Sequence, residues 1–122
     1  MAKDSETNIQ ELKQKIKAFA EERDWDQFHN AKDLAIAMSI EVSELLELFR
    51  FKSNKEVEDF FKNPQKRKDI EDEMADVLFF LTRLAQRYNI DLSNAFEEKI
   101  RESAKKYPVE KAKGSNKKYN EL

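Results

Sequence analysis

Four acidic residues lie at positions where the sequence gives them no basic neighbour. Glu41 and Glu44 are three residues apart, and so are Glu73 and Asp76. Residues with this spacing project from one side of an α-helix, about one turn apart. Surface acids on charge-balanced helices commonly have Lys or Arg three or four positions away, but these four have none, although the chain has 23 basic residues. The pattern indicates a functional acidic site.

Four carboxylates brought together without a cation would repel one another, and burial would raise their pKa values or destabilise the fold. A hard divalent cation removes this conflict. Mg²⁺, with Mn²⁺ as a possible substitute, binds a few carboxylates, keeps some waters and completes its shell with substrate phosphate oxygens. Either pair alone is more simply explained as a solvated helix face, but two such pairs favour a metal site. A di-iron centre normally needs Glu-x-x-His on two helices, and His29 is the only histidine.

The composition excludes several other kinds of site. The only glycine, Gly114, is near the C-terminus, so no P-loop or GxGxxG phosphate cradle exists. The absence of cysteine excludes disulfides, thiol nucleophiles and Cys/His zinc sites. With 25 acidic and 23 basic residues, no basic excess favours nucleic acid as a partner. No apolar run approaches the ~20 residues needed to cross a membrane, so we expect a soluble cytoplasmic protein.

Helices must position the four acids. Abundant Glu, Lys, Leu and Ala, with apolar residues at steps of three and four, favour helix throughout. The predicted fold class is all-α, a four-to-five-helix bundle. Five segments are expected: from a Thr7–Gln10 capping box to about Arg23, from Asn30 to near Lys52, from a Ser53–Glu56 capping box through Phe61, from Pro64 to about Tyr88, and from Asp91 to Tyr107-Pro108.

The helices are expected to form one domain over residues 1–108, followed by a polar, Lys-rich tail over 109–122 without structure. The segment from Pro64 to about Tyr88 has a wide apolar surface that a chain of this length cannot readily hide. This surface includes Val77, Phe79, Phe80, Leu81 and Leu84. We therefore predict a homo-oligomer, a tetramer built as a dimer of dimers.

The acidic motif resembles that of a known family. Glu41-x-x-Glu44 and Glu73-x-x-Asp76, with residues 45–72 between them, are similar to the E-x-x-E, E-x-x-D signature of the MazG-like all-α nucleoside triphosphate pyrophosphohydrolases. The likeness covers roughly residues 9–108 and is greatest to the dCTP pyrophosphatase branch. It rests on segments 19–25, 28–29, 41–52, 73–81 and 90–92, on Lys99 and on Tyr107-Pro108.

The resemblance implies hydrolysis of (deoxy)nucleoside triphosphates to the monophosphate and pyrophosphate, as house-cleaning of non-canonical or excess dNTPs. Mg²⁺ held by the four acids would polarise phosphate oxygens and lower the pKa of an attacking water. Either Glu41 or Glu44 is a candidate general base. Lys99 matches a family lysine suited to bind phosphate, and Trp25 matches an aromatic that packs against the base. Related enzymes build the pocket from more than one chain, so Lys99 or Trp25 could serve a neighbour's site.

The pocket departs from the dCTP pyrophosphatase pattern at four positions, where that branch has histidine, tryptophan, tyrosine and asparagine. Here those positions hold Ile16, Phe51, Phe80 and Ser103. Aromatic packing from Trp25 and Phe51 is retained, but base-edge hydrogen bonding is not expected from these side chains. An apolar slot discriminates by size and shape, so we expect several pyrimidine nucleotides to be accepted, with kcat/KM values within about two orders of magnitude. His29 is interpreted as a structural loop residue.

The alternative function is a non-enzymatic helical interaction module. Such a module has no use for four unpartnered acids and would show no Mg²⁺-dependent stabilisation. An enzyme would be stabilised by added metal and nucleotide, because both bind the folded state.

Overall fold

The computed structural model describes residues 2–122, and in these residues it contains helices and turns but no strand. The all-α prediction is therefore confirmed. The helices are α1 (Ile9–Glu22), α2 (Ala31–Glu47), α3 (Asn54–Phe60), α4 (Pro64–Arg87), α5 (Leu92–Lys106) and α6 (Val109–Ala112). Three short 3-10 turns are η1 (Asp4–Glu6), η2 (Asp26–Phe28) and η3 (Tyr119–Glu121). None of the helices in this part of the chain is long and apolar enough to span a membrane.

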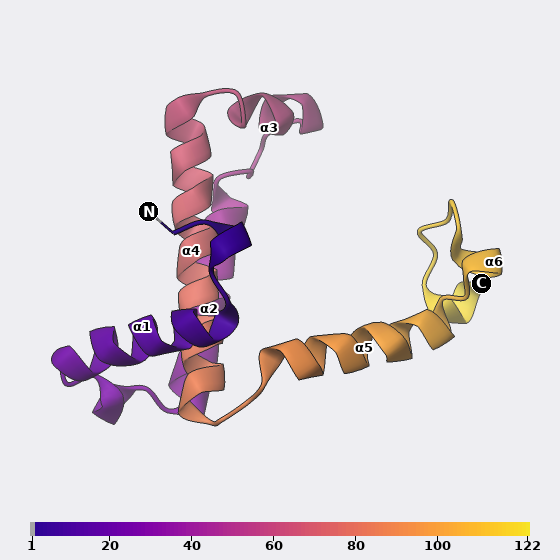
Figure 1. The fold of residues 1–122 in the computed structure, drawn as a ribbon. Coiled ribbons are helices and arrows are strands. Elements are labelled where there is room, and N and C mark those ends of the chain that lie inside the picture. Colours follow the sequence, from indigo (N-terminus) through magenta and orange to yellow (C-terminus); the bar gives the residue numbers. More distant parts are fainter. Residues whose placement is uncertain (1) are drawn as a thin grey trace. The chain divides into compact units, whose positions relative to one another are not determined.

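The chain separates into two compact units, one ending at Asn89 and the other spanning Ile90–Leu122. In the first unit, α2 and α4 lie side by side and run antiparallel, and α1 packs across α4 (Figure 1). The apolar side chains buried between these three helices are Ala20, Leu34, Ile70 and Ala85. The α2–α4 pair is the scaffold that carries both acidic motifs.

Four of the five predicted helix N-caps are confirmed. The side chains of Asn30, Ser53, Asn63 and Asp91 each accept a hydrogen bond from a backbone N–H three residues later. At Ser53 the predicted capping box is complete, because the Glu56 carboxylate also accepts the Ser53 N–H. Pro64 begins α4, where its missing N–H costs nothing.

Two predicted helix boundaries were wrong. The first helix is capped by Asn8, whose Oδ1 accepts the Glu11 N–H at 2.9 Å, so the Thr7–Gln10 capping box does not form. Asn is at least as good a cap as Thr, and the helix starts one residue later than predicted. The second helix ends at Glu47 rather than near Lys52. Residues 48–51 form turns, and Phe51 adopts a left-handed φ of 63°, which a continuing helix cannot accommodate.

The second unit contains α5, α6 and η3. The fifth predicted helix is confirmed, with Asp91 as its cap and its end before Tyr107-Pro108. Within 109–122, where the sequence predicts no structure, α6 and η3 are present. The Tyr119 ring packs edge-on against Tyr107 at 6.2 Å, and the Lys106 ammonium lies 5.0 Å from the Tyr119 ring centre. These contacts tie the end of the chain back to the end of α5.

Candidate metal centre and base pocket

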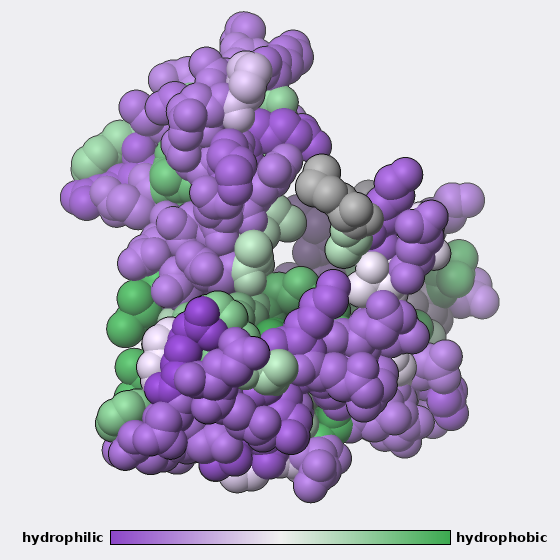
Figure 2. All heavy atoms as spheres, turned by 60° about the vertical axis from the view of Figure 1, so that its left-hand side comes forward, coloured by the Kyte–Doolittle hydropathy of each residue, from purple (hydrophilic) through white to green (hydrophobic). Residues whose placement is uncertain are grey.

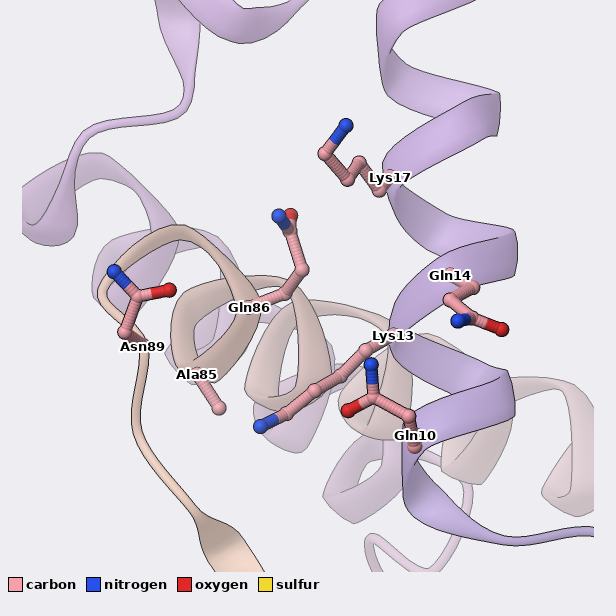
Figure 3. Close-up of a pocket in the computed structure, with 7 residues that line it drawn as sticks. All are labelled: Gln10, Lys13, Gln14, Lys17, Ala85, Gln86 and Asn89. Carbon is pink, nitrogen blue, oxygen red and sulfur yellow. The ribbon is translucent and has the colours of Figure 1, made fainter.

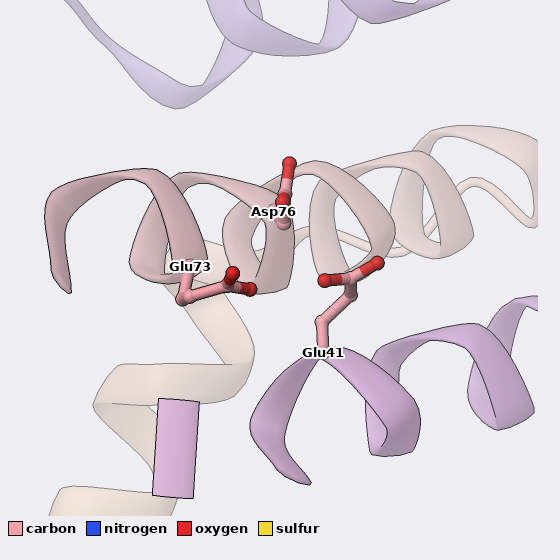
Figure 4. A group of neighbouring side chains, drawn as sticks. All are labelled: Glu41, Glu73 and Asp76. Carbon is pink, nitrogen blue, oxygen red and sulfur yellow. The ribbon is translucent and has the colours of Figure 1, made fainter. Parts of the chain in front are cut away.

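The antiparallel pairing of α2 and α4 brings Glu41 opposite Glu73 and Asp76. Each of the three side chains offers one carboxylate oxygen, and these oxygens lie within 4.8 Å of one another. Figure 4 shows Glu41 reaching from α2 toward the two acids on α4. Glu41 and Glu73 are half-buried, and Asp76 is exposed. The spacing suits a single cation bridging the two helices.

Glu44 lies beside this group without belonging to it. It is exposed and one turn further along α2 than Glu41. Its carboxyl group interacts with those of both Glu41 and Glu73. The structure thus gathers all four predicted acids, three as a converging set and the fourth at its edge.

The converging acids are electrostatically uncompensated. The Oε2 atoms of Glu41 and Glu73 are buried and have no hydrogen-bond partner. Burial, reinforced by the adjoining Glu44 carboxyl group, raises the pKa of Glu41 to about 7. The pKa of Glu73 is raised by the same two causes. Buried carboxylate oxygens without donors are what a hard cation such as Mg²⁺ would satisfy, so these residues fit a divalent metal.

An aromatic hollow adjoins the acids along α4. It has a volume of about 280 Å³ and is lined by Trp25, Phe28, His29, Phe79 and Phe80. Phe80 is four residues after Asp76, so the hollow begins about one turn, or ~6 Å, beyond the last acid. A flat ring bound in this hollow would therefore lie close enough to the acids for a group attached to the ring to reach them.

The walls of the hollow are built from packed aromatic rings. The ring centre of Phe19, on α1, lies 5.6 Å from that of Trp25 and 5.9 Å from that of Phe79, and both contacts are edge-on. Phe79 in turn meets Phe80 at 5.1 Å. Edge-to-face packing of this kind fixes ring orientation, so Trp25 is held although more than a third of its surface is exposed.

Arg83 fastens the loop that carries Trp25 and His29 onto α4. Its side chain is 1% exposed, and its guanidinium donates hydrogen bonds to the Asp26 carboxylate and to His29 Nδ1, the latter at 2.8 Å. Arg87 donates to the backbone carbonyls of His29 and Asp26 at 3.3 and 3.4 Å. The Arg83 hydrogen bond lowers the pKa of Asp26, which keeps this ion pair charged.

Comparison with known proteins identifies the family. The model of the MazG-like family matches residues 36–122, which include all four acids. The chain belongs to the MazG-like family. It is 38% identical to dCTP pyrophosphatase 1 of Rattus norvegicus over 117 residues, 96% of this chain and 69% of the relative. Identity to dCTP pyrophosphatase 1 of Homo sapiens is 37%, with the same coverage.

A solved structure shares this MazG-like fold. The crystal structure of a pyrophosphatase from Archaeoglobus fulgidus matches with a TM-score of 0.77 and 31% sequence identity. The match covers 88% of this chain and 99% of that one. The resemblance stated from the sequence motifs is therefore confirmed.

Of the side chains predicted for the nucleotide pocket, Trp25 and Phe80 line the aromatic hollow, whereas Ile16 and Phe51 do not. Ile16 is half-buried on α1 and lines another apolar hollow with Leu78 and Thr82, and Phe79 lines both hollows. Phe51 is 88% exposed after the end of α2, with the Arg50 guanidinium 4.6 Å from its ring centre. Lys99 and Ser103 lie one turn apart on α5 of the second unit.

The sequence did not indicate that Phe28 and Phe79 line the aromatic hollow or that Arg83 holds the loop. It indicated Phe79 only as part of the apolar surface of the helix. The available signal is a stripe at steps of three and four along α4, formed by Glu73, Asp76, Phe80, Arg83 and Arg87. One face of the MazG-like domain's longest helix therefore carries acids, then an aromatic ring, then the arginines that hold the loop.

A third hollow, with a polar lining, lies between α1 and the end of α4 (Figure 3). Its volume is about 170 Å³, and it is lined by Gln10, Lys13, Gln14, Lys17, Ala85, Gln86 and Asn89. Lys17 pairs with Glu21 at 2.7 Å, and the Gln86 amide accepts a hydrogen bond from Arg83. This lining contains no carboxylate, in contrast to the acids between α2 and α4.

Proposed function

We propose that this MazG-like protein is a Mg²⁺-dependent nucleoside triphosphate pyrophosphohydrolase. It hydrolyses the anhydride between the α and β phosphorus atoms and releases a nucleoside monophosphate and pyrophosphate. The observation that carries the proposal is the convergence of Glu41, Glu73 and Asp76 with buried carboxylate oxygens that have no partner. The names of its relatives, dCTP pyrophosphatase 1 and a pyrophosphatase, support the same reaction class.

The proposed roles follow from the position of each acid. When bound, Mg²⁺ polarises phosphate oxygens and neutralises the charge that develops on them. Glu41, Glu73 and Asp76 supply the oxygens that hold it. Of the two candidate bases, Glu44 is the better placed, because it borders this set, is exposed and is not one of the three converging acids. Glu44 would accept a proton from the attacking water while the pyrophosphate oxygen leaves.

The aromatic hollow is the proposed nucleobase site. Trp25, Phe28, Phe79 and Phe80 offer ring faces and edges against which a base can pack. Deoxynucleotides of the cytoplasmic pool, non-canonical or in excess, are the proposed substrates. Lys99 of the same or a neighbouring chain is proposed to bind phosphate as a point charge.

A pyrophosphate-release screen over standard and modified nucleotides tests the function. Release should require Mg²⁺, stop on chelation and be lost in Glu73→Gln. The same samples should show a rise in Tm when Mg²⁺ and nucleotide are added together, because both bind only the folded state. A helical interaction module would show neither release nor stabilisation, and that result would refute the enzymatic function.

We further propose that the active form is a dimer of dimers. Large apolar side chains remain exposed on α2 and α4, where Ile36, Ile40, Met74 and Leu78 are each about half exposed. Figure 2 shows hydrophobic residues at the surface among the hydrophilic ones on the face that it presents. Light scattering should give about four times the 14.5 kDa chain mass. A fully active 14.5 kDa monomer would contradict this expectation.

Replacing Phe51 by Ala should raise KM while changing kcat less. Phe51 is 88% exposed and does not line the hollow of its own chain, so a stacking role would require a neighbouring chain's pocket. Loss of a stacking surface worth about 1 kcal/mol corresponds to roughly a fivefold rise in KM. Phe61→Ala, also an exposed aromatic, is the matched control and should leave KM unchanged. Equal effects of both variants would argue against a specific role for Phe51.

A further inference from the structure

The polar hollow between α1 and the end of α4 gathers nitrogen donors from both helices (Figure 3). The side chains that α1 contributes share one helix face, because they are three or four residues apart, and each ends in an amide or an ammonium group: Gln10, Lys13, Gln14 and Lys17. The opposite wall is formed by Ala85, Gln86 and Asn89. Two ammonium groups and four carboxamides therefore border one space.

The hollow has room for a ligand because one wall is formed by a small side chain. Ala85 is 2% exposed and presents only a methyl group, and the volume left open is about 170 Å³. Lys13 and Gln86 are half-buried at its walls. Partial burial removes water from around such groups, so an opposite charge interacts with them more strongly than on an open surface.

Arg83 fixes the orientation of the Gln86 amide. Its guanidinium donates a hydrogen bond to Gln86 Oε1. A guanidinium has donors only, so the amide oxygen faces Arg83 and the amide NH2 group is left for a ligand. Arg83 is 1% exposed and is also held by the Asp26 carboxylate. The α4 wall of the hollow thus presents two N–H donors on a fixed amide.

The two lysines give the hollow a positive charge, although the net charge of the chain is -2. Lys17 forms an ion pair with Glu21 at 2.7 Å, and the two side chains are 52% and 46% exposed. An ion pair this exposed contributes little to stability, because water and salt screen it. A multiply charged anion that enters the hollow would therefore displace Glu21 from the Lys17 ammonium.

We propose that the polar hollow binds a phosphate group, either as free phosphate or as part of a small phosphate-bearing molecule. A phosphate group carries several oxygens that each accept more than one hydrogen bond, which matches donors that arrive from two helices. Lysine binds phosphate as a point charge, without the fixed geometry that an arginine pair would need. The proposal is independent of the proposed function, because the acids between α2 and α4 take no part in it.

Titration of the full chain with inorganic phosphate, in the absence of divalent metal, tests the site. In nitrogen-15 NMR spectra, the side-chain NH2 signals of Gln10, Gln14 and Asn89 should shift and saturate with one common dissociation constant. The NH2 signal of Asn94, which lies on α5 outside the hollow, should not shift. Sodium chloride at the same ionic strength is the control. Shifts that chloride reproduces, or that never saturate, would overturn the proposal.

Two substitutions on α1 should change the phosphate affinity in opposite directions. Lys17→Gln should weaken binding about tenfold, the effect of losing a hydrogen bond from a charged donor. Glu21→Gln frees Lys17 from its ion pair and should strengthen binding about two- to threefold. Both positions are exposed on the helix surface, so neither change should affect folding.

Lys15→Gln and Glu22→Gln are the matched controls, because they make the same charge changes on α1 outside the hollow. At an ionic strength of about 0.15 M, where distant charges are screened, each should change the affinity less than about 1.5-fold. If Lys15→Gln weakens binding as much as Lys17→Gln, the general charge of the helix holds the phosphate, and the proposed site is overturned.

Pyrophosphate in place of phosphate distinguishes two sources of the bound group. Binding more than about fivefold tighter would identify a diphosphate, the kind of product that the proposed reaction releases, and equal affinity would identify a single phosphate group. Both results support the site. Saturable binding of neither anion would overturn it and leave the proposed function standing, since hydrolysis is measured separately with Mg²⁺ and nucleotide.

Discussion

Replacing Glu41 by Gln should lower kcat by a factor of hundreds or more and leave the protein folded. The amide keeps the shape of the side chain but removes the charge that would hold the cation between α2 and α4. Positioning and charge neutralisation supply most of the catalysis of phosphoryl transfer, so the loss falls on kcat. Steady-state pyrophosphate release and circular dichroism of the same sample measure the two outcomes.

The same result is expected for Glu44→Gln, Glu73→Gln and Asp76→Asn. Without metal, these variants should melt at the same temperature as the wild type or higher, because each substitution removes one of several repelling charges. Glu47→Gln is the matched control, since Glu47 is exposed on α2 and pairs with Arg50 at 3.5 Å. Near wild-type turnover in two or more of the four acid variants would refute the site.

Binding of Mg²⁺ should strengthen as the pH rises toward 7 and level off above it. The pKa of Glu41 is raised from its ordinary value of 4.5 to about 7, and that of Glu73 is raised too. Below pH 7 the cation must displace a proton from Glu41, so affinity should change about tenfold per pH unit for each proton released. Isothermal titration in two buffers of different ionisation enthalpy should show about one proton released at pH 6 and fewer at pH 8.

The metal-free protein should show the matching change in stability. Because the pKa of Glu41 is higher in the folded than in the unfolded chain, its stabilising contribution is complete below about pH 4.5 and is lost as the pH rises through about 7. Saturating Mg²⁺ should therefore raise Tm more at pH 8 than at pH 5.5. Equal increases at the two pH values would show that Glu41 does not lose a proton to the cation.

The acids and their helices could be predicted because the sequence features that specify them lie within a few residues of one another. Spacing of three residues fixes which side chains share a helix face, and caps such as Ser53 and Asp91 act on N–H groups three residues away. The two acid pairs were expected to share one metal site, because neither pair has a basic partner, but which faces of α2 and α4 pack together to bring Glu41 to Glu73 was not predicted.

The loop network could not be predicted, because Arg83 and His29 are 54 residues apart and no spacing rule joins them. The interpretation of His29 as a structural loop residue agrees with its hydrogen bond from Arg83, but the sequence did not indicate which residue would be its partner. The left-handed φ of Phe51 could not be predicted either, because aromatic residues rarely adopt this conformation. Both misses concern loops, where tertiary contacts rather than local propensity decide the conformation.

The stripe of Glu73, Asp76, Phe80 and Arg83 places the proposed metal ligands and the proposed base site on the same helix, α4. A helix advances 1.5 Å and turns about 100° per residue, so the separation between the acids and Phe80 is fixed by the number of residues between them. One residue inserted between Asp76 and Phe80 would rotate Phe80 and Arg83 away from the acids and release the His29 loop. For the proposed enzyme, we therefore expect substrate range to change through side-chain replacements on α4 rather than through insertions in this helix.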